Sequence, residues 1–297
     1  NFCSKIWNAF RLIKGWTVDD NIQAPDAAKL AVHWFESKQN EVAAEVADLF
    51  SKYRLSEALM AVYKLFWDEF SSWYLEMIKP AYGQGIDRTT YSATLCFLDN
   101  LLHLLHPFMP FITEELWQQM YERNAEEGES LMVSALSMDT YVDTAFVAQF
   151  EVVKGVISNI RSIRLQKNIA QKEPLDLQVL GENPVAEFNA VIQKMCNLSS
   201  ITVVESKAEG ASSFMVGTTE YAVPLGNMID VEAEIARMEA ELKHKEGFLQ
   251  GVLKKLSNEK FVNNAPAAVL EMERKKQADA ESIISSLKES IAALKKA

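Results

Sequence analysis

The sequence predicts a mainly α-helical protein in three parts: a helical bundle over residues 1–125, a long helix with a small α/β unit over 126–229, and an antiparallel coiled-coil hairpin over 230–297. Three observations carry this prediction. Glycine and proline are scarce, with 11 and 8 residues in 297, which disfavours an all-β chain. Apolar residues recur at helical spacing through most of the chain. Strand-like alternation is confined to residues 175–223.

The bundle is expected to contain five helices. The first covers residues 1–16, the second runs from Pro25 to about residue 50, and the third covers 56–78 and ends before a Gly-Gln-Gly loop. Asp87 is the predicted N-cap of the fourth helix, 89–105. Thr113 is the predicted cap of the fifth, whose first turn carries Glu114 and Glu115, matched to the helix dipole.

In the middle part of the chain, residues 126–229, the spacing of apolar residues changes from a helical to a strand-like period. A long helix is expected over 143–167, followed by a strand at 175–179, a helix at 184–195 and a second strand at 201–204. Residues 214–216 and 221–223 predict two more strands around Gly217. Together these elements form a small α/β unit.

In the tail, residues 230–297, apolar residues recur mainly every three or four positions, in two separate runs. Asn and Pro residues break the pattern between 257 and 266, so two helices folded back on each other are the economical solution. The first, of roughly 27 residues, would be about 40 Å long. Lys245 and Lys276 interrupt the two apolar seams. The predicted seam residues are Val231, Ile235, Met238, Leu242, Leu249, Val252, Leu256, Met272, Ile283, Leu287, Ile291 and Leu294.

The net charge of −11 is unevenly distributed. Residues 1–229 hold 18 basic and 29 acidic side chains and therefore carry all of it, while residues 230–297 hold 12 of each. Within the tail, residues 243–276 hold 8 basic and 4 acidic side chains, a net of +4. A basic-tipped arm on an acidic body suits an extended anionic partner such as RNA. The alternative is a coiled coil with merely solvated charged faces, serving as a helical scaffold that binds proteins.

Composition excludes several classes of protein. Three scattered cysteines cannot form a disulfide framework or a four-cysteine zinc site. No apolar run approaches the roughly 20 residues of a membrane span, and the start lacks the regions of a signal peptide. A cytoplasmic protein that does not enter the membrane is expected.

No catalytic motif emerges from the sequence, and no metal site is expected. His103 and His106 could form a metal pair, but no further ligand at suitable spacing accompanies them, so structural roles are favoured. Cys196 is interpreted as an inert buried thiol. Four aromatic residues are favoured as core over base-stacking platforms: Trp67, Phe70, Trp73 and Tyr74.

Several motifs are specific in sequence and order. Residues 1–11 (NFCSKIWNAFR), 73–80 (WYLEMIKP) and 106–117 (HPFMPFITEELW) resemble motifs of the anticodon-binding domain of class I aminoacyl-tRNA synthetases of the valine, isoleucine and leucine group. Residues 160–164 (IRSIR) and 224–234 (PLGNMIDVEAE) continue the resemblance. Residues 255–266 (KLSNEKFVNNAP) resemble the coiled-coil arm of the valyl-tRNA synthetase family. The resemblance covers essentially the whole chain, and Phe10 departs from it by standing where a smaller residue is usual.

The resemblance implies a C-terminal fragment of a longer, monomeric ligase that joins valine to tRNA(Val) with ATP. In that family the catalytic domain, with its His-Ile-Gly-His and Lys-Met-Ser-Lys-Ser motifs, and the editing domain precede this region. The fragment is therefore expected to bind tRNA but to be inactive alone, and the ATP and Mg sites belong to the catalytic domain. The equivalent region of another branched-chain synthetase is the alternative within the class.

The resemblance also implies which residues touch tRNA. In the bundle, which would read the anticodon, they are Asn8, Arg11, Lys14 and Lys79. In the arm, which would touch the outer corner of the tRNA, they are Lys254, Lys255, Asn258, Lys260, Phe261 and Arg274. Asn8 could instead form a helix-to-helix hydrogen bond, and Phe261 could instead plug the hairpin turn.

Overall fold

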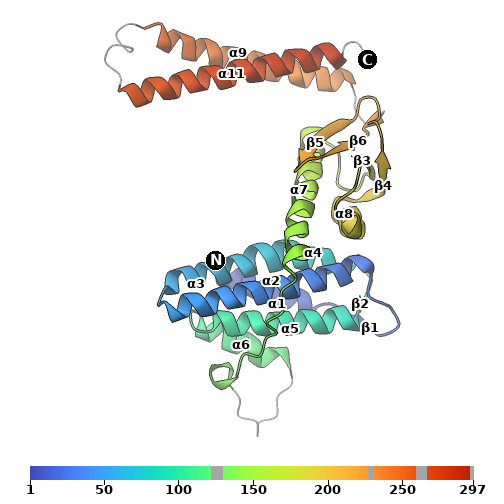
Figure 1. Cartoon of the computed structure of the whole chain (residues 1–297), viewed down its shortest axis with the longest axis vertical. Helices are drawn as coiled ribbons and strands as arrows, with labels where there is room; N and C mark the ends of the chain where they lie inside the picture. Colours follow the sequence, from blue (N-terminus) through green and yellow to red (C-terminus); the bar gives the residue numbers. More distant parts are fainter. Residues whose placement is uncertain (122–129, 227–230, 259–265, 295–297) are drawn as a thin grey trace. The chain divides into compact units, whose positions relative to one another are not determined.

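The computed structural model describes residues 1–121, 130–226, 231–258 and 266–294 and shows a mainly α-helical chain with one small mixed sheet (Figure 1). The chain forms two compact units, residues 1–165 with 170–224, and residues 166–169 with 225–297. The first unit includes both the predicted bundle and the predicted α/β part. Among the described residues, no helix combines the length and the hydropathy that a membrane crossing requires.

The bundle is built from helices that each bury one apolar face. In chain order they are α1 (Phe2–Lys14), α2 (Asp26–Ser51), α3 (Leu55–Lys64), the π-helical segment η1 (Leu65–Tyr74), α4 (Leu75–Ile78), α5 (Arg88–Leu105) and α6 (Pro110–Met120). Their common core is aromatic, because the buried ring of Phe35 contacts Phe70, Tyr74 and Phe97 at centroid distances of 5.2, 4.9 and 5.1 Å. The predicted bundle and the order of its helices are confirmed.

The predicted cap of α5 is confirmed and that of α6 is wrong. The carboxylate of Asp87 accepts a hydrogen bond from the Thr90 amide at 2.8 Å, as an N-cap should. Helix α6 begins at Pro110, whose fixed backbone suits a first helical position. Thr113 consequently lies inside the helix, where its hydroxyl donates to the Met109 carbonyl at 2.8 Å.

Glu114 therefore does not serve the dipole of α6 in the way that the sequence predicted. Its carboxylate accepts from the Leu131 amide at 3.0 Å and from the Ser130 hydroxyl at 2.8 Å. These bonds fix the start of the short 3₁₀ turn η3 (Leu131–Val133) against the bundle.

The predicted third helix is one continuous rod with an unexpected middle. Residues 65–74 wind as a π-helix, and the Ser72 hydroxyl donates to the Trp67 carbonyl five residues earlier at 2.9 Å. Aromatic rings four residues apart are in contact along this segment: Phe66 and Phe70 at 5.6 Å, Phe70 and Tyr74 at 5.5 Å. Helical periodicity alone could not distinguish this winding from an α-helix.

The α/β part follows α7 (Thr144–Gln166) and matches the predicted order of strands and helix. Its elements are β3 (Leu175–Leu180), the short turn η4 (Ala186–Phe188), α8 (Asn189–Cys196), β4 (Leu198–Val204), β5 (Ser212–Val216) and β6 (Thr219–Val223). The sheet order is β4-β3-β6-β5, in which only β3 and β4 are parallel. Gly217 turns the β5–β6 hairpin with a φ of +59°.

A second, two-residue pairing ties the bundle together near the end of α1. Strand β1 (Val18–Asp19) runs parallel to β2 (Ile86–Asp87), with Val18 opposite Ile86. The Ile86 amide donates to the Thr17 carbonyl at 2.9 Å. The segment after α1 is thereby fixed to the segment before α5.

The arm is a pair of long helices, α9 (Val231–Leu256) and α11 (Ala267–Leu294), which lie side by side in Figure 1. Two ion pairs cross between the helices: Lys255, at the end of α9, pairs with Glu273 near the start of α11, and Glu246, further back in α9, pairs with Lys288 further along α11. This pairing is antiparallel and confirms the predicted hairpin. The turn residues 259–265 lie outside the described residues.

The apolar seam of α11 differs from the predicted one. Met272 and Ile283 are 53% and 39% exposed, whereas Ala280, Ile284 and Ile291 are buried. The buried positions extend back to Glu273, at steps of seven, four and seven residues. A carboxylate therefore occupies a seam position, and the two apolar residues that looked like seam members lie one position before buried ones.

Candidate nucleic-acid interface

Helix α1 presents a polar face to solvent. Asn8 and Arg11 are exposed, whereas Ile6, Ala9, Phe10 and Ile13 on the other face are buried. Phe10, which departs from the family motif, is only 4% exposed and packs within the core. Helix α1 therefore has one stripe of residues in the core and a polar stripe that faces solvent.

Asn8 borders a small hollow of about 180 Å³ between α1 and the continuous helix formed by η1 and α4. Lys5 and Leu12 line this hollow from α1, and Ser71 and Glu76 line it from the η1–α4 helix. Among the described residues, the Asn8 side chain makes no hydrogen bond with the protein, so the helix-to-helix bond considered as its alternative role is absent. The hydroxyl of Ser71 is buried and also lacks a partner within the described part of the chain.

Lys5 and Trp67 form a basic and aromatic pair beside Asn8. The Lys5 ammonium lies 4.9 Å from the centre of the Trp67 ring, a cation–π geometry. Trp67 is half-buried and stacks on Tyr63 with centroids 5.6 Å apart. Trp67 was predicted to be a core residue, and this prediction is only partly met. Phe70 and Tyr74, for which the same prediction was made, are fully buried.

Lys14 lies on the opposite edge of α1 and has a structural partner. Its ammonium donates to the Met120 carbonyl at 3.2 Å, which joins the end of α1 to the end of α6. Any contact with a phosphate would have to compete with this bond.

Lys79 caps α4 at the rim of a larger hollow of about 660 Å³. The hollow is lined by residues 15–17 after α1 and by residues 79–85, so the ends of α1 and α4 form one site. The Lys79 ammonium is 3.8 Å from Glu76, an exposed pair of little strength. Its own carbonyl accepts from the Lys194 ammonium of α8 at 2.9 Å, which anchors the loop that follows.

Basic and aromatic residues that the sequence reasoning missed lie around the same rod. Tyr82 is completely exposed in the loop after α4. The Arg161 guanidinium of α7 covers the Trp73 ring at 5.6 Å. An aromatic residue in a glycine-rich loop was the available signal for Tyr82, whereas only tertiary structure brings Arg161 and Lys194 to this rod.

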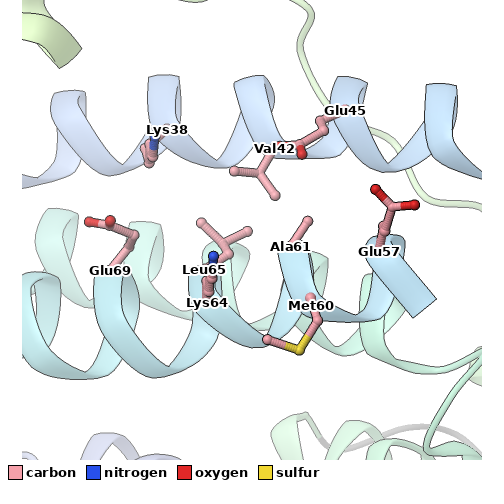
Figure 2. Close-up of a pocket in the computed structure, with 9 residues that line it drawn as sticks. All are labelled: Lys38, Val42, Glu45, Glu57, Met60, Ala61, Lys64, Leu65 and Glu69. Atoms are coloured by element: carbon pink, nitrogen blue, oxygen red, sulfur yellow. The ribbon is translucent and has the colours of Figure 1, made fainter. Parts of the chain in front are cut away.

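The other flank of the α3–η1 rod has a different character. A hollow of about 400 Å³ lies here, lined by Lys38, Val42 and Glu45 on α2 and, among others, by Glu57, Met60, Lys64 and Glu69 on the α3–η1 side (Figure 2). Burial opposes the charge of Lys38, but its hydrogen bond to Glu41 and nearby carboxylates raise its pKa. This flank carries three carboxylates, those of Glu45, Glu57 and Glu69, and two lysines, of which Lys38 is paired and Lys64 is peripheral. It is therefore a poor surface for binding a phosphate group.

The arm presents its cations on the outside. Lys254 and Arg274 are exposed and make no ion pair within the described residues, while Lys255 lies 3.9 Å from Glu273. Glu273 is 5% exposed and also binds the Lys276 ammonium at 2.8 Å. Asn258 is exposed just beyond α9, and Lys260 and Phe261 lie outside the described residues.

The residues weighed for metal binding or catalysis have structural surroundings. His103 contacts Asp99 and Ser134, and His106 lies 2.8 Å from the Thr113 hydroxyl. In the described ranges no group of three or more possible metal ligands gathers. Burial raises the pKa of the Cys196 thiol to about 12, which keeps it protonated and unreactive.

Two protein families match parts of the chain. Residues 32–179 match the family described as the anticodon-binding domain of tRNA ligase, and residues 230–295 match the valyl tRNA synthetase tRNA binding arm. All of the chain aligns at 99% identity with 34% of a valine–tRNA ligase from Bacteroides thetaiotaomicron, and at 72% with 34% of one from Phocaeicola vulgatus. A more distant valine–tRNA ligase, from Enterococcus faecalis, is 35% identical over 312 residues. The chain spans about a third of the length of the curated relatives it matches.

Proposed function

Because the chain belongs to the valyl-tRNA synthetase family and carries its anticodon-binding domain and tRNA-binding arm, we propose that it is the tRNA-binding part of an ATP-dependent valine–tRNA ligase. Its partner is tRNA, and the valine names of its relatives favour tRNA(Val). The chemistry of joining valine to tRNA, with its ATP and Mg²⁺, belongs to other parts of such a ligase. The chain alone is expected to bind tRNA and to activate no valine.

The bundle is proposed to read the anticodon with the exposed face of α1 and the rim at Lys79. Anticodon bases are unstacked, so their edges and faces are open to side chains, unlike bases in the deep groove of an A-form helix. The amide of Asn8 has free donors and acceptors for a base edge, and Arg11 is exposed beside it. Lys5 and Lys79 supply cations at the two hollows on this side.

The arm is proposed to contact the outer corner of the tRNA through phosphates. The observation that carries this role is the pair of exposed cations Lys254 and Arg274, which form no ion pair with any residue that the structure describes and lie in the region that matches a tRNA-binding arm. Lys255 shares its charge with Glu273, so it both stabilises the hairpin and adds to the local potential. Asn258, Lys260 and Phe261 remain proposed contacts nearer the turn.

The experiment is a salt titration of tRNA(Val) binding by the whole chain. Each lysine–phosphate contact releases counterions, so the logarithm of affinity should fall steeply with the logarithm of salt concentration. Lys254→Ala with Lys255→Ala should flatten the slope by about one to two. The matched control, Lys29→Ala with Lys52→Ala, removes the same charge from two exposed lysines paired on the bundle and should leave the slope near that of the unaltered chain.

Absence of tRNA binding at low salt would overturn the proposed function. Equal slopes for the arm variant and its control would remove the arm from the contact surface while leaving the bundle.

A further inference from the structure

We infer that the hollow between α5, α6 and residues 134–137 is a hydrolytic site for small neutral or cationic esters, with the Ser134 hydroxyl as nucleophile and His103 as general base. The hollow has a volume of about 400 Å³, which lies within the range of pockets that hold small ligands. It is lined from α5, the end of α6 and the segment after η3, rather than from α1 or the arm, so the inference does not depend on the proposed function.

The contacts of His103 determine which ring nitrogen carries the proton. Its Nδ1 lies 2.9 Å from the Asp99 carbonyl oxygen, and because a carbonyl can only accept, Nδ1 is the protonated nitrogen of the neutral ring. Nε2 then carries the lone pair, and it lies 3.1 Å from the Ser134 Oγ. The serine hydroxyl therefore donates to Nε2, which is the arrangement in which an imidazole takes the proton of an attacking hydroxyl.

A carboxylate lies on the other side of the imidazole. The Asp99 Oδ2 is 3.2 Å from the His103 Nδ1, and the Asp99 Oδ1 accepts from the Trp117 Nε1 at 2.8 Å. The negative charge stabilises the imidazolium that forms when the ring takes a proton, and the indole bond holds the carboxylate in position. Asp99, His103 and Ser134 thus have the order and the roles of a serine hydrolase triad.

Local structure holds these three groups in place. Asp99 and His103 are four residues apart on α5, so they lie one above the other on the same face. Ser134 directly follows η3, and its amide donates to the Ser130 carbonyl at 3.1 Å. The bonds that Glu114 makes to the start of η3 fix this turn against α6, so the nucleophile is positioned before a substrate arrives.

Asn100 supplies a donor for the oxyanion of a tetrahedral intermediate. Its side chain lines the hollow, and one of its two amide N–H groups donates to the Gln39 Oε1 at 3.1 Å. The other N–H group has no hydrogen-bond partner among the described residues. Side-chain amides of this kind stabilise developing oxyanions in hydrolases.

Cys96 also lines the hollow but does not compete as nucleophile. Burial, reinforced by the charges of Asp99 and Glu36, raises the pKa of its thiol. The thiol therefore stays protonated at neutral pH, and the thiolate is the nucleophilic form of cysteine. The reacting atom of this hollow is consequently the Ser134 Oγ.

The lining favours neutral or cationic substrates. Trp117 and Tyr121 contribute aromatic surface, and the Asp99 carboxylate contributes a negative charge. Carboxylate and phosphate groups are repelled by that charge, whereas acyl chains and ammonium groups are not. The Tyr121 ring is 45% exposed, so the hollow is open to solvent on that side and admits both an ester and water.

The reaction proceeds in two balanced steps. The Ser134 Oγ forms a bond to the ester carbonyl carbon while its proton moves to the His103 Nε2; the bond from that carbon to the alcohol oxygen then breaks, and the alcohol leaves with the proton from Nε2. Water attacks the acyl group on Ser134 and gives its proton to Nε2. The carboxylic acid leaves, and Nε2 returns the proton to the Ser134 oxygen.

The test has two readouts on the whole chain: labelling by an alkyl fluorophosphonate, located by peptide mass spectrometry, and hydrolysis of p-nitrophenyl acetate. The fluorophosphonate should label Ser134, forming the Oγ–P bond as fluoride leaves. Ser134→Ala should abolish that label and lower the hydrolysis rate at least about tenfold. His103→Gln should slow both reactions at least about tenfold, since a positioned general base contributes about 10²–10⁴-fold.

The chain provides a matched control in Ser137, which lines the same hollow and makes no hydrogen bond to His103 within the described residues. Ser137→Ala should keep the label on Ser134 and stay within about twofold of the unaltered rate. Ser134→Ala should keep the thermal unfolding midpoint and the tRNA affinity of the unaltered chain.

Three results would overturn the inference. The first is an unlabelled Ser134 under conditions that label a known serine esterase. The second is a hydrolysis rate that Ser134→Ala leaves unchanged, which would place the reaction at other surface groups. The third is labelling of Ser134 that a folded His103→Gln chain retains at full rate, because the hydroxyl would then react without its base.

Discussion

The guanidinium of Arg164 is 1% exposed and has three carbonyl partners in the α/β part. It donates to the carbonyls of Ala170 at 2.9 Å, Cys196 at 2.7 Å and Asn197 at 3.3 Å. The last two carbonyls end α8, where Asn197 adopts a left-handed φ of +50°. Burial lowers the pKa of Arg164, yet arginine stays charged in proteins, so the side chain acts as a cationic cap of a helix C-terminus.

Arg164→Met should therefore destabilise the chain by roughly 2–4 kcal/mol, because it removes charge-assisted hydrogen bonds and leaves buried carbonyls unsatisfied. Urea unfolding followed by circular dichroism would measure the loss. Arg161→Met is the control: that guanidinium is exposed on Trp73 and should contribute no more than about 1 kcal/mol. Equal losses for the two variants would contradict the capping role.

At the scale of residues, the sequence predicted exposure better than partnership. Asn8 and Arg11, which the resemblance implies as contacts to tRNA, are both exposed on α1. The sequence pattern could not show that Lys14 meets the Met120 carbonyl, 106 residues away. Nor could it show that Tyr82 remains outside the core, because an aromatic residue in a loop folds inward or outward according to tertiary contacts.

Among the elements, the arm shows the effect of a polar residue in an apolar seam. Glu273 occupies a buried position of α11, where it binds Lys276 and faces Lys255. The hydrogen bond from Lys276 is the main cause that holds the pKa of Glu273 below its ordinary value near 4.5. A depressed pKa in the folded state means that ionised Glu273 stabilises the arm above that ordinary value, and that this contribution is lost as the pH falls through the folded value.

The prediction is a pH-dependent difference between the unaltered chain and Glu273→Gln. Thermal melting of helix content should show the variant to be less stable at pH 6 and indistinguishable at pH 3. Glu271→Gln, at an exposed position of the same helix, should show little difference at either pH. A pH-independent effect of Glu273→Gln would mean that shape rather than charge matters at this position.

A helix or strand could be predicted from the sequence wherever its position depends on a single local rule. Asp87 before α5 and the alternating apolar residues of β3 were read correctly because caps and strand periods are local. The start of α6 was misplaced because Thr113 and Pro110 both satisfy rules for helix starts, and the proline was the true one. In α11, the seam was misassigned because a carboxylate at Glu273 looked like a surface residue.

On the scale of the whole molecule, the charge separates with the structure. Residues 1–229 carry all of the −11, and the paired helices of the second unit carry a net charge near zero with cations toward the hairpin end. An acidic body repels RNA at long range, except where local cations such as Lys79 and Lys254 offset it. Specific binding should therefore depend on a few positions rather than on general attraction.

Two tRNA(Val) transcripts that differ only in carrying a valine or an isoleucine anticodon test whether the bundle contributes identity. The chain should prefer the valine anticodon by about tenfold, the order expected from losing one base contact. Filter binding at a fixed salt concentration measures the ratio. Equal affinities would mean that the arm reads only the shape of the tRNA and that the bundle does not discriminate anticodons.

The π-helical winding of residues 65–74 has a consequence for the direction in which the helix beyond it faces. A turn closed by i→i+5 bonds holds more residues than an α-helical turn, so each residue of this segment advances the chain by a smaller angle than an α-helical residue does. If the same ten residues wound as an α-helix, α4 would be rotated about the helix axis while α3 stayed fixed. Because Lys79 follows α4 directly, the winding of η1 helps to set the side on which this lysine lies.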